Sequence, residues 1–260
     1  MIELTDLLIL GGAGLAAGIL AGFLGIGGGT IVVPILLALG YQPVEAVATS
    51  SLSITITALS GSVQNWRMGY LKFRQVLSLG LPALVTAQIG AYLADAVFSP
   101  RILLFAFAGL LFLNTYLVQL KKKITTQEPN PETSTESKFN PIIAYLITGG
   151  IAGLLAGLFG VGGGVIMVPL QILLLNQPIK TAIQTSLGVV VITGLSACLG
   201  HAMRGNVIWL TGVLLGTFGL IASQLSTRFL PKLPDKAVSL AFRLLLVSLA
   251  FYILKQAWQS

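Results

Sequence analysis

The stretch GFLGIGGGTIVVP, residues 22–34, decides how this chain folds, because it returns as GLFGVGGGVIMVP at residues 157–169. Over the wider windows 17–34 and 152–169, 12 of 18 positions are identical at a constant offset of 135 residues. A glycine inside a helix costs ~1 kcal/mol relative to alanine, so three successive glycines favour the end of a helix. The sequence therefore predicts the same break twice, once in each of two repeats.

The composition is that of a membrane protein. Apolar residues make up 55% of the 260 positions and charged residues 9%, against about 25% charged in soluble domains. Glu3 and Asp6 stand near the start with no basic segment beside them, which argues against a cleaved signal peptide. Cys198 is the one cysteine, so no disulfide within the chain is expected. The net charge of +7 is better explained by topology than by nucleic-acid binding.

Ten apolar segments follow one another along the chain. They cover residues 4–24, 30–40, 43–66, 74–97, 101–120, 140–160, 165–175, 178–202, 207–229 and 236–257. The polar run KKKITTQEPNPETSTESKFNP between the fifth and sixth segments cannot bury a core, so it predicts a solvated linker. We therefore predict an all-α polytopic membrane protein with a first transmembrane repeat over 1–120, a polar cytoplasmic linker over 121–140 and a second repeat over 141–260.

The duplication extends well beyond the glycines. Gln42-Pro43 matches Gln177-Pro178, and Ser50-Ser51-Leu52 matches Thr185-Ser186-Leu187, both at the offset of 135. After one inserted residue the offset becomes 136, which pairs Gly69 with Gly205, Gly80 with Gly216 and Gln88 with Gln224. Each half of the chain thus repeats one unit of about five segments.

The short segments 30–40 and 165–175 decide whether the repeats are parallel or inverted. Each spans about 16 Å as a helix, against a hydrocarbon core of about 30 Å. If each completes the crossing of the segment before it, the repeats are parallel; if each turns back as a hairpin, they are inverted.

Basic residues discriminate between the two arrangements. Hairpins with a cytoplasmic linker place 11 basic residues inside and 3 outside, whereas the parallel arrangement gives 9 and 5. The inside set of the hairpin arrangement is Arg67, Lys72, Arg74, Lys121, Lys122, Lys123, Lys138, Lys180, Arg228, Lys232 and Lys236. We therefore expect inverted repeats with broken or re-entrant helices, the two termini on opposite faces and the C-terminus outside.

Glycine breaks at membrane depth are typical of sites where half-helices begin beside a cavity. Thr30 is placed to cap the following helix, and Pro34 to fall in its first turn. Such a helix start presents unpaired N–H groups and a partial positive charge, which favour an anion. Close helix packing through small residues is the alternative that the sequence leaves open. A dinucleotide-binding loop is disfavoured, because no strand precedes the glycines.

Polar residues inside the spans suggest a hydrophilic path. On a helix over 43–66, one stripe is formed by Thr49, Ser53, Thr57, Ser60 and Gln64. The second half has a thinner version in Thr185, Thr193 and Ser196. Hydrogen bonding between neighbouring helices is the competing explanation for each of these residues.

None of the eight acids lies near the middle of a span, so no carboxylate proton relay or cation pathway is indicated. Asn65, Arg67, His201 and Arg204 lie near span ends, where gating, proton exchange and interfacial anchoring are the alternatives. Gly194-Leu195-Ser196 resembles an intramembrane serine-protease motif, but on one helix Ser196 and His201 point about 140° apart. We therefore expect no enzymatic activity, no cofactor and no metal.

The duplicated motif, followed in each half by Thr/Ser-Ser-Leu and then by NWRMGYLKF or HAMRGNVIW, resembles the TauE/SafE sulfite-exporter family over the whole chain. The resemblance implies an inner-membrane permease for small sulfur-containing anions such as sulfite, sulfoacetate or other sulfonates. Asn65 stands where the second half has His201, and Phe73 where it has Trp209, so the two half-sites are not equivalent.

Together these features predict export of a small sulfur-containing anion through a central site between the repeats. We expect the anion near Gly27, Gly28, Gly29, Thr30, Thr49, Ser50, Ser51, Gly162, Gly163, Gly164, Gln184, Thr185 and Ser186. A passive anion channel, a membrane component without transport of its own and an importer of a sulfur oxyanion such as thiosulfate stay open. The expected partners are the anion and the lipid bilayer, with no nucleic acid; a homodimer stays open.

Overall fold

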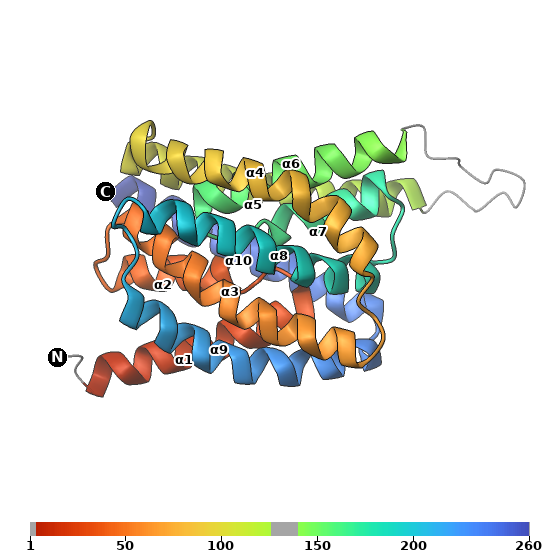
Figure 1. The fold of residues 1–260 in the computed structure, drawn as a ribbon, viewed down its shortest axis with the longest axis horizontal. Helices are drawn as coiled ribbons and strands as arrows, with labels where there is room; N and C mark the ends of the chain where they lie inside the picture. Colours follow the sequence, from red (N-terminus) through yellow and green to blue (C-terminus); the bar gives the residue numbers. More distant parts are fainter. Residues whose placement is uncertain (1–3, 126–139, 260) are drawn as a thin grey trace, which may run out of the picture.

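The structure is a computed structural model that describes residues 4–125 and 140–259, and these residues form helices and no strand. Figure 1 shows the long helices side by side in one bundle. In chain order the elements are α1 (Leu4–Leu24), α2 (Gly29–Ala38), α3 (Pro43–Arg67), α4 (Phe73–Ala96), α5 (Pro100–Thr125), α6 (Pro141–Phe159), α7 (Gly164–Leu174), α8 (Ile179–Ala202), α9 (Trp209–Phe229), the 3-10 helix η1 (Leu230–Lys232) and α10 (Asp235–Gln259).

The all-helical membrane fold predicted from the sequence is confirmed. Among the described helices, six are long and apolar enough to cross a bilayer: α1, α3, α4, α6, α8 and α9. Helix ends agree with the predicted segments to within two residues, except that α5 continues to Thr125 instead of ending at residue 120. Lys121–Lys123, which we expected in the linker, therefore belong to α5, and residues 126–139 of the linker lie outside the described residues.

Capping residues explain where two of the helices begin. The Glu45 carboxylate accepts a hydrogen bond from the Gln42 backbone N–H at 3.1 Å, and Pro43 occupies the first position of α3. The Asn140 side chain accepts from the Ile142 N–H at 3.1 Å ahead of α6. Proline at a first helical position removes an N–H that would have no helical partner.

Left-handed glycines separate α1 from α2 and α6 from α7. Within these two breaks, six glycines have φ between +63° and +81°: Gly25, Gly27, Gly28, Gly160, Gly162 and Gly163. Side chains with a Cβ are disfavoured at such angles, which explains why the same glycines occur in both halves.

The helix after the first break begins earlier than the sequence suggested. The prediction that Thr30 caps this helix is wrong, because α2 begins at Gly29 with Gly28 as its N-cap. Pro34 accordingly lies inside α2 rather than in its first turn. The physical reason is that left-handed glycines turn the chain within four residues, so helical geometry resumes at once. Because proline has no N–H, the Thr30 carbonyl lacks its usual helical partner.

After the first break the chain turns back toward the end of the bundle where α1 began. α1 runs alongside α9 in the same direction, since Gly14 faces Leu215 and Gly22 faces Thr227. The residue that follows α2, Tyr41, bonds Thr211 in the first turn of α9 at 3.1 Å. α1 therefore runs to the level of the last turn of α9, and the chain then returns through α2 to the level of the first turn of α9.

The helices of the two halves interleave. α1 packs along α9, α4 along α6, α3 against α8 in the middle, and α5 against α10 (Figure 1). Glycines allow the closest of these approaches: Gly14, Gly18 and Gly22 lie on the α9 backbone, and Gly149, Gly153 and Gly157 lie on the α4 backbone. Small residues at such interfaces let helices gain dispersion contacts that lipid does not replace.

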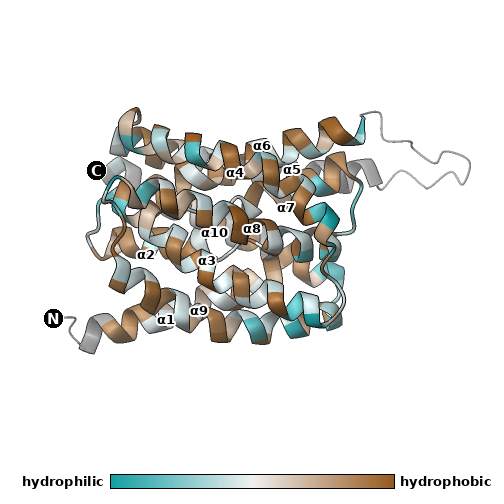
Figure 2. Cartoon of the chain, in the orientation of Figure 1, coloured by the Kyte–Doolittle hydropathy of each residue, from teal (hydrophilic) through white to brown (hydrophobic). Residues whose placement is uncertain are grey.

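The two ends of the bundle carry different charge. Figure 2 shows the hydrophilic residues concentrated at the two ends. Lys180, at the start of α8, reaches Asp235 at 3.2 Å and the Pro231 carbonyl at 3.2 Å, so these residues share one end. At the other end Arg204 lies 3.6 Å from Asp95. The first end holds seven basic residues that we predicted inside: Arg67, Lys72, Arg74, Lys180, Arg228, Lys232 and Lys236.

The prediction that the two termini lie on opposite faces is wrong. Figure 1 shows the start of α1 and the end of α10 at the same end of the bundle, opposite the end of α5 and the start of α6. In each half, three long helices pass from one end of the bundle to the other: α3, α4 and α5 in the first half, and α8, α9 and α10 in the second. The hairpin before them, α1–α2 or α6–α7, returns the chain to the end at which it started and so adds no crossing. Two odd numbers of crossings return the chain to the face on which it began.

Cysteine labelling tests which end faces the cytoplasm. In a Cys198→Ala background, Tyr70→Cys lies at the basic end and Met203→Cys at the opposite end, and both positions are exposed. Because positive residues favour the inside, we expect a membrane-impermeant maleimide to label Met203→Cys in intact cells and Tyr70→Cys only after permeabilisation. The reverse pattern would contradict this orientation.

Candidate functional site

The two glycine breaks meet in the interior of the bundle. Gly29, the first residue of α2, packs on the Gly160 carbonyl, and Gly164, the first residue of α7, packs on the Gly25 carbonyl. Residues 25–29 and 160–164 are all buried. Each half-helix therefore begins against the break of the other half.

Two branched side chains lie between the breaks. An ideal Cβ on Gly27 would come within 2.8 Å of Val190 Cγ1, and one on Gly162 within 2.7 Å of the same atom and 2.9 Å of Ile54 Cδ1. Ile54 comes from α3 and Val190 from α8, at the offset of 136 that relates the two halves. These two apolar side chains fill the space between the glycines in this conformation.

Hydroxyl groups from α3 and α8 bond the break carbonyls, and two of the three come from the opposite half. Ser50 Oγ donates to the Gly160 carbonyl at 2.7 Å, and Ser186 Oγ donates to the Gly25 carbonyl at 2.7 Å. Thr193 Oγ1 donates to the Gly162 carbonyl at 2.9 Å. A buried carbonyl without a partner costs about 1–3 kcal/mol, so these hydroxyls hold the non-helical backbone in place.

The electrostatics of the centre favour negative charge. α2 and α7 start at glycine N-caps, Gly28 and Gly163, which supply no capping side chain. The first amides of a helix have no partners within it and carry about half a positive charge. Thr30 Oγ1 in the first turn of α2 is fully buried and has no hydrogen-bond partner. The centre thus offers donors and a positive potential without a charged side chain.

The structure brings together nine of the residues predicted to bind substrate: Gly27, Gly28, Gly29, Thr30, Ser50, Gly162, Gly163, Gly164 and Ser186. The other four bond elsewhere. Thr49 Oγ1 accepts from the Ile208 N–H at 3.1 Å, and Ser51 Oγ donates to the Val47 carbonyl of its own helix at 2.9 Å. Thr185 Oγ1 donates to Gln75 at 3.5 Å, and the Gln184 carbonyl accepts from Asn65.

The polar stripe on α3 joins this helix to α9. Ser60 Oγ donates to the Leu220 carbonyl at 2.8 Å, one turn beyond Thr57, whose hydroxyl bonds its own helix. Thr49 likewise accepts from the Ile208 N–H just before α9. These contacts favour interhelical hydrogen bonding over a hydrophilic path as the explanation for the stripe.

The four residues considered for gating lie at both ends of the spans. His201 is fully buried and its Nε2 donates to the Gly157 carbonyl at 3.0 Å. Asn65 is fully buried against α8, and Arg67 is exposed at the basic end. Arg204 pairs with Asp95 and lies 5.3 Å from the Tyr92 ring centre. Ser196 bonds the α4 backbone at Leu84, away from the His201 bond to α6.

Sequence analysis missed the apolar residues of the centre. Ile54 and Val190 carry no chemical signal, although their match at offset 136 was available in the repeat. Among the described residues, no three His, Cys, Asp or Glu side chains gather as metal ligands would.

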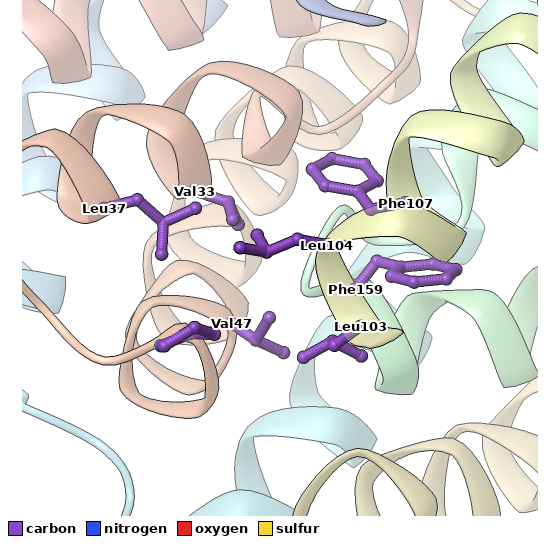
Figure 3. A pocket seen from close by; sticks show the side chains of 8 residues that line it. Val33, Leu37, Val47, Leu103, Leu104, Phe107 and Phe159 are labelled. Carbon is purple, nitrogen blue, oxygen red and sulfur yellow. The ribbon is translucent and has the colours of Figure 1, made fainter. Parts of the chain in front are cut away.

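An apolar pocket lies beside the second break (Figure 3). Its lining residues are Val33, Leu37, Pro43, Val47, Leu103, Leu104, Phe107 and Phe159, from α2, α3, α5 and the end of α6. Phe159 stacks on Phe107 with ring centres 5.4 Å apart. These side chains offer no donor to an anion, so we assign the candidate anion site to the breaks and not to this pocket.

Comparison with known proteins gives a consistent answer over nearly the whole chain. A family model described as "Sulfite exporter TauE/SafE" matches residues 10–253. The probable membrane transporter protein YdhB of Bacillus subtilis is 30% identical over 225 residues, covering 85% of this chain and 90% of its own.

Two further relatives carry the same description. The probable membrane transporter protein YunE of Bacillus subtilis is 27% identical, covering 90% of this chain and 92% of its own. A probable membrane transporter protein of Xylella fastidiosa strain 9a5c is 27% identical, covering 99% and 98%. The descriptions of these three relatives name a transporter and no substrate.

Alanine at the N-cap glycines tests the role of the breaks. Gly28→Ala places a Cβ at φ +81° and within 2.7 Å of the Ala17 carbonyl oxygen, and Gly163→Ala meets the Ala152 carbonyl in the same way. Gly40→Ala is the matched control, because its φ is +87° and nothing lies within 4 Å. All three variants incur the left-handed penalty of about 1–2 kcal/mol. We expect a larger fall in thermal unfolding midpoint at Gly28 and Gly163; equal falls would contradict the close packing of the breaks.

Neighbouring serines on α3 test the hydrogen bond between the halves. Ser50→Ala leaves the Gly160 carbonyl buried without its partner, so we expect a loss of about 1–3 kcal/mol in the free energy of unfolding. Ser51→Ala removes only a bond within α3, so we expect less than about 1 kcal/mol. Equilibrium unfolding in mixed micelles measures both, and equal losses would argue against the cross-half bond.

Proposed function

The chain belongs to the TauE/SafE sulfite exporter family, and from this premise we propose that it exports a small sulfur-containing anion, such as sulfite, sulfoacetate or a related sulfonate, across the inner membrane. That it is a multi-pass membrane transporter follows from the family and the helices. The proposal concerns its substrate, its site and its direction.

The observation that carries the proposal is the meeting of two uncapped helix starts in the buried interior. The amides after Gly28 and Gly163 are donors of the kind that bind oxyanions at helix N-termini. A sulfite or sulfonate group presents three oxygens, which suits backbone N–H groups and the Thr30 hydroxyl. Because these groups are neutral, the anion is held by dipoles and can also leave.

The same arrangement supports transport by two inverted repeats, one over residues 1–120 and one over 141–260. Half-helices that start at the midplane and point their N-termini at a shared site recur in transporters of this design. Ile54 and Val190 separate Gly27 from Gly162, so we propose that these side chains close the path in this conformation. Movement of α3 against α8 would then open the centre to one face at a time.

The direction follows from electrostatics. A monovalent anion that leaves a cell with a negative interior gains about 2.3 kcal/mol per 100 mV, equivalent to a concentration ratio of about 50-fold. Uptake would have to overcome this term through coupling to another ion. No acid lies near the middle of a span to supply a carboxylate for proton coupling, so we propose electrogenic efflux.

Two alternatives are distinguished by their kinetics. A passive anion channel would show single-channel conductance and no acceleration by anion on the opposite side. An importer of an oxyanion such as thiosulfate would accumulate it against the potential, at the expense of a second ion gradient.

Proteoliposomes loaded with sulfite or sulfoacetate test the proposal under an imposed potassium diffusion potential. We expect efflux to rise as the interior is made more negative and to persist when the pH gradient is collapsed. Gly40→Ala should retain this flux, and Gly28→Ala should lose it. Flux that ignores voltage and follows the pH gradient would contradict the proposal and implicate His201 as a proton carrier.

A further inference from the structure

The last turn of α6 has a partner that the last turn of α1 lacks. His201 Nε2 donates to the carbonyl of Gly157, near the end of α6. The equivalent of Gly157 is Gly22 in α1, and the equivalent of His201 is Asn65. Asn65 Nδ2 reaches the Gln184 carbonyl at 3.5 Å instead. The hydrogen bonds found among the described residues include none to the carbonyl of Gly22.

Three side-chain oxygens on α3 and α9 also lack partners. Asn65 Oδ1, Ser223 Oγ and Thr227 Oγ1 belong to fully buried residues and make no hydrogen bond. An ideal Cβ on Gly61 would lie 2.8 Å from Ser223 Oγ and 3.1 Å from Thr227 Oγ1, and one on Gly22 would lie 2.8 Å from Thr227 Oγ1. The two hydroxyls thus converge between α1 and α3, one helical turn from Asn65.

The other half of the molecule has no such hydroxyls. At the offset of 136, Ser223 corresponds to Ala87 and Thr227 to Ala91, both fully buried. One half therefore combines a histidine with two alanines, and the other combines an asparagine with two hydroxyl residues. The first set supplies an imidazole N–H to the helix end, whereas the second leaves three side-chain oxygens without a partner.

We propose that the Asn65 amide oxygen, the Ser223 and Thr227 hydroxyls and the Gly22 carbonyl bind a monovalent cation, with Na⁺ as the ligand. The last turn of a helix carries about half a negative charge, which favours a cation there. Half-helix ends and free carbonyls hold Na⁺ in other transporters. Divalent cations usually require carboxylates, and this set contains none. The bound ion takes the place that the His201 imidazole occupies in the other half.

Thermal unfolding of the purified protein, without any anion substrate, tests this site. Replacing choline chloride by NaCl at constant ionic strength should raise the unfolding midpoint saturably, because Na⁺ binds only the folded protein. Thr227→Val removes one ligand while it keeps the shape, so we expect the dependence on Na⁺ to be lost or shifted to at least tenfold higher concentration. Thr217→Val is the matched control on the same helix, since Thr217 is exposed and bonds only Val213, and it should respond as the wild type does.

A second variant keeps the test decisive if Thr227→Val does not fold. Asn65→His combined with Ser223→Ala and Thr227→Ala copies the set found around His201, and we expect it to fold without any dependence on Na⁺. No effect of Na⁺ on the wild type, an equal effect of choline, or an unchanged response in both variants would overturn the site. Because no anion is present, none of these outcomes depends on the export proposal.

Discussion

Backbone polar groups that leave a helix inside the membrane need partners, because hydrocarbon offers none. This constraint organises the whole molecule. The left-handed glycines expose the Gly25 and Gly160 carbonyls at two places, and the serine that bonds each carbonyl stands on the opposite half of the chain. The central helices α3 and α8 are consequently tied to the breaks and to each other. Glycines also pack α1 closely on α9 and α4 closely on α6, beside these central helices.

Much of this fold could be predicted from the sequence, because its strongest signals are local. Apolar length gives the helices, and the run Gly27–Gly29 with its copy gives the breaks. Signals that depend on helix rotation were less informative. Ser50 and Ser51 are neighbours in the same motif, yet Ser50 bonds the opposite half and Ser51 its own helix. The different bonding of these two serines depends on how α3 is rotated about its axis against α6 and α8, and the residue types do not determine that rotation.

Duplication explains the shared architecture, and divergence explains where the halves can differ in chemistry. Both halves keep the glycines, the serine next to the matched leucine and the interleaved packing. They differ near the ends of α3 and α8, where Asn65 stands in one half and His201 in the other. A site built from two related halves need not treat its two faces alike.

The pairing of α1 with α9 has a consequence for synthesis. α1 leaves the ribosome well before α9, the helix whose backbone it contacts most closely, because α9 begins only at Trp209. Until that helix has been made, the face of α1 that carries Gly14, Gly18 and Gly22 meets lipid or a holding chaperone. Contacts over so long a stretch of chain make assembly slow. The first half is thus inserted early, but α1 gains its closest partner only when α9 has been made, so a chain truncated before Trp209 would keep α1 without the helix on which it packs.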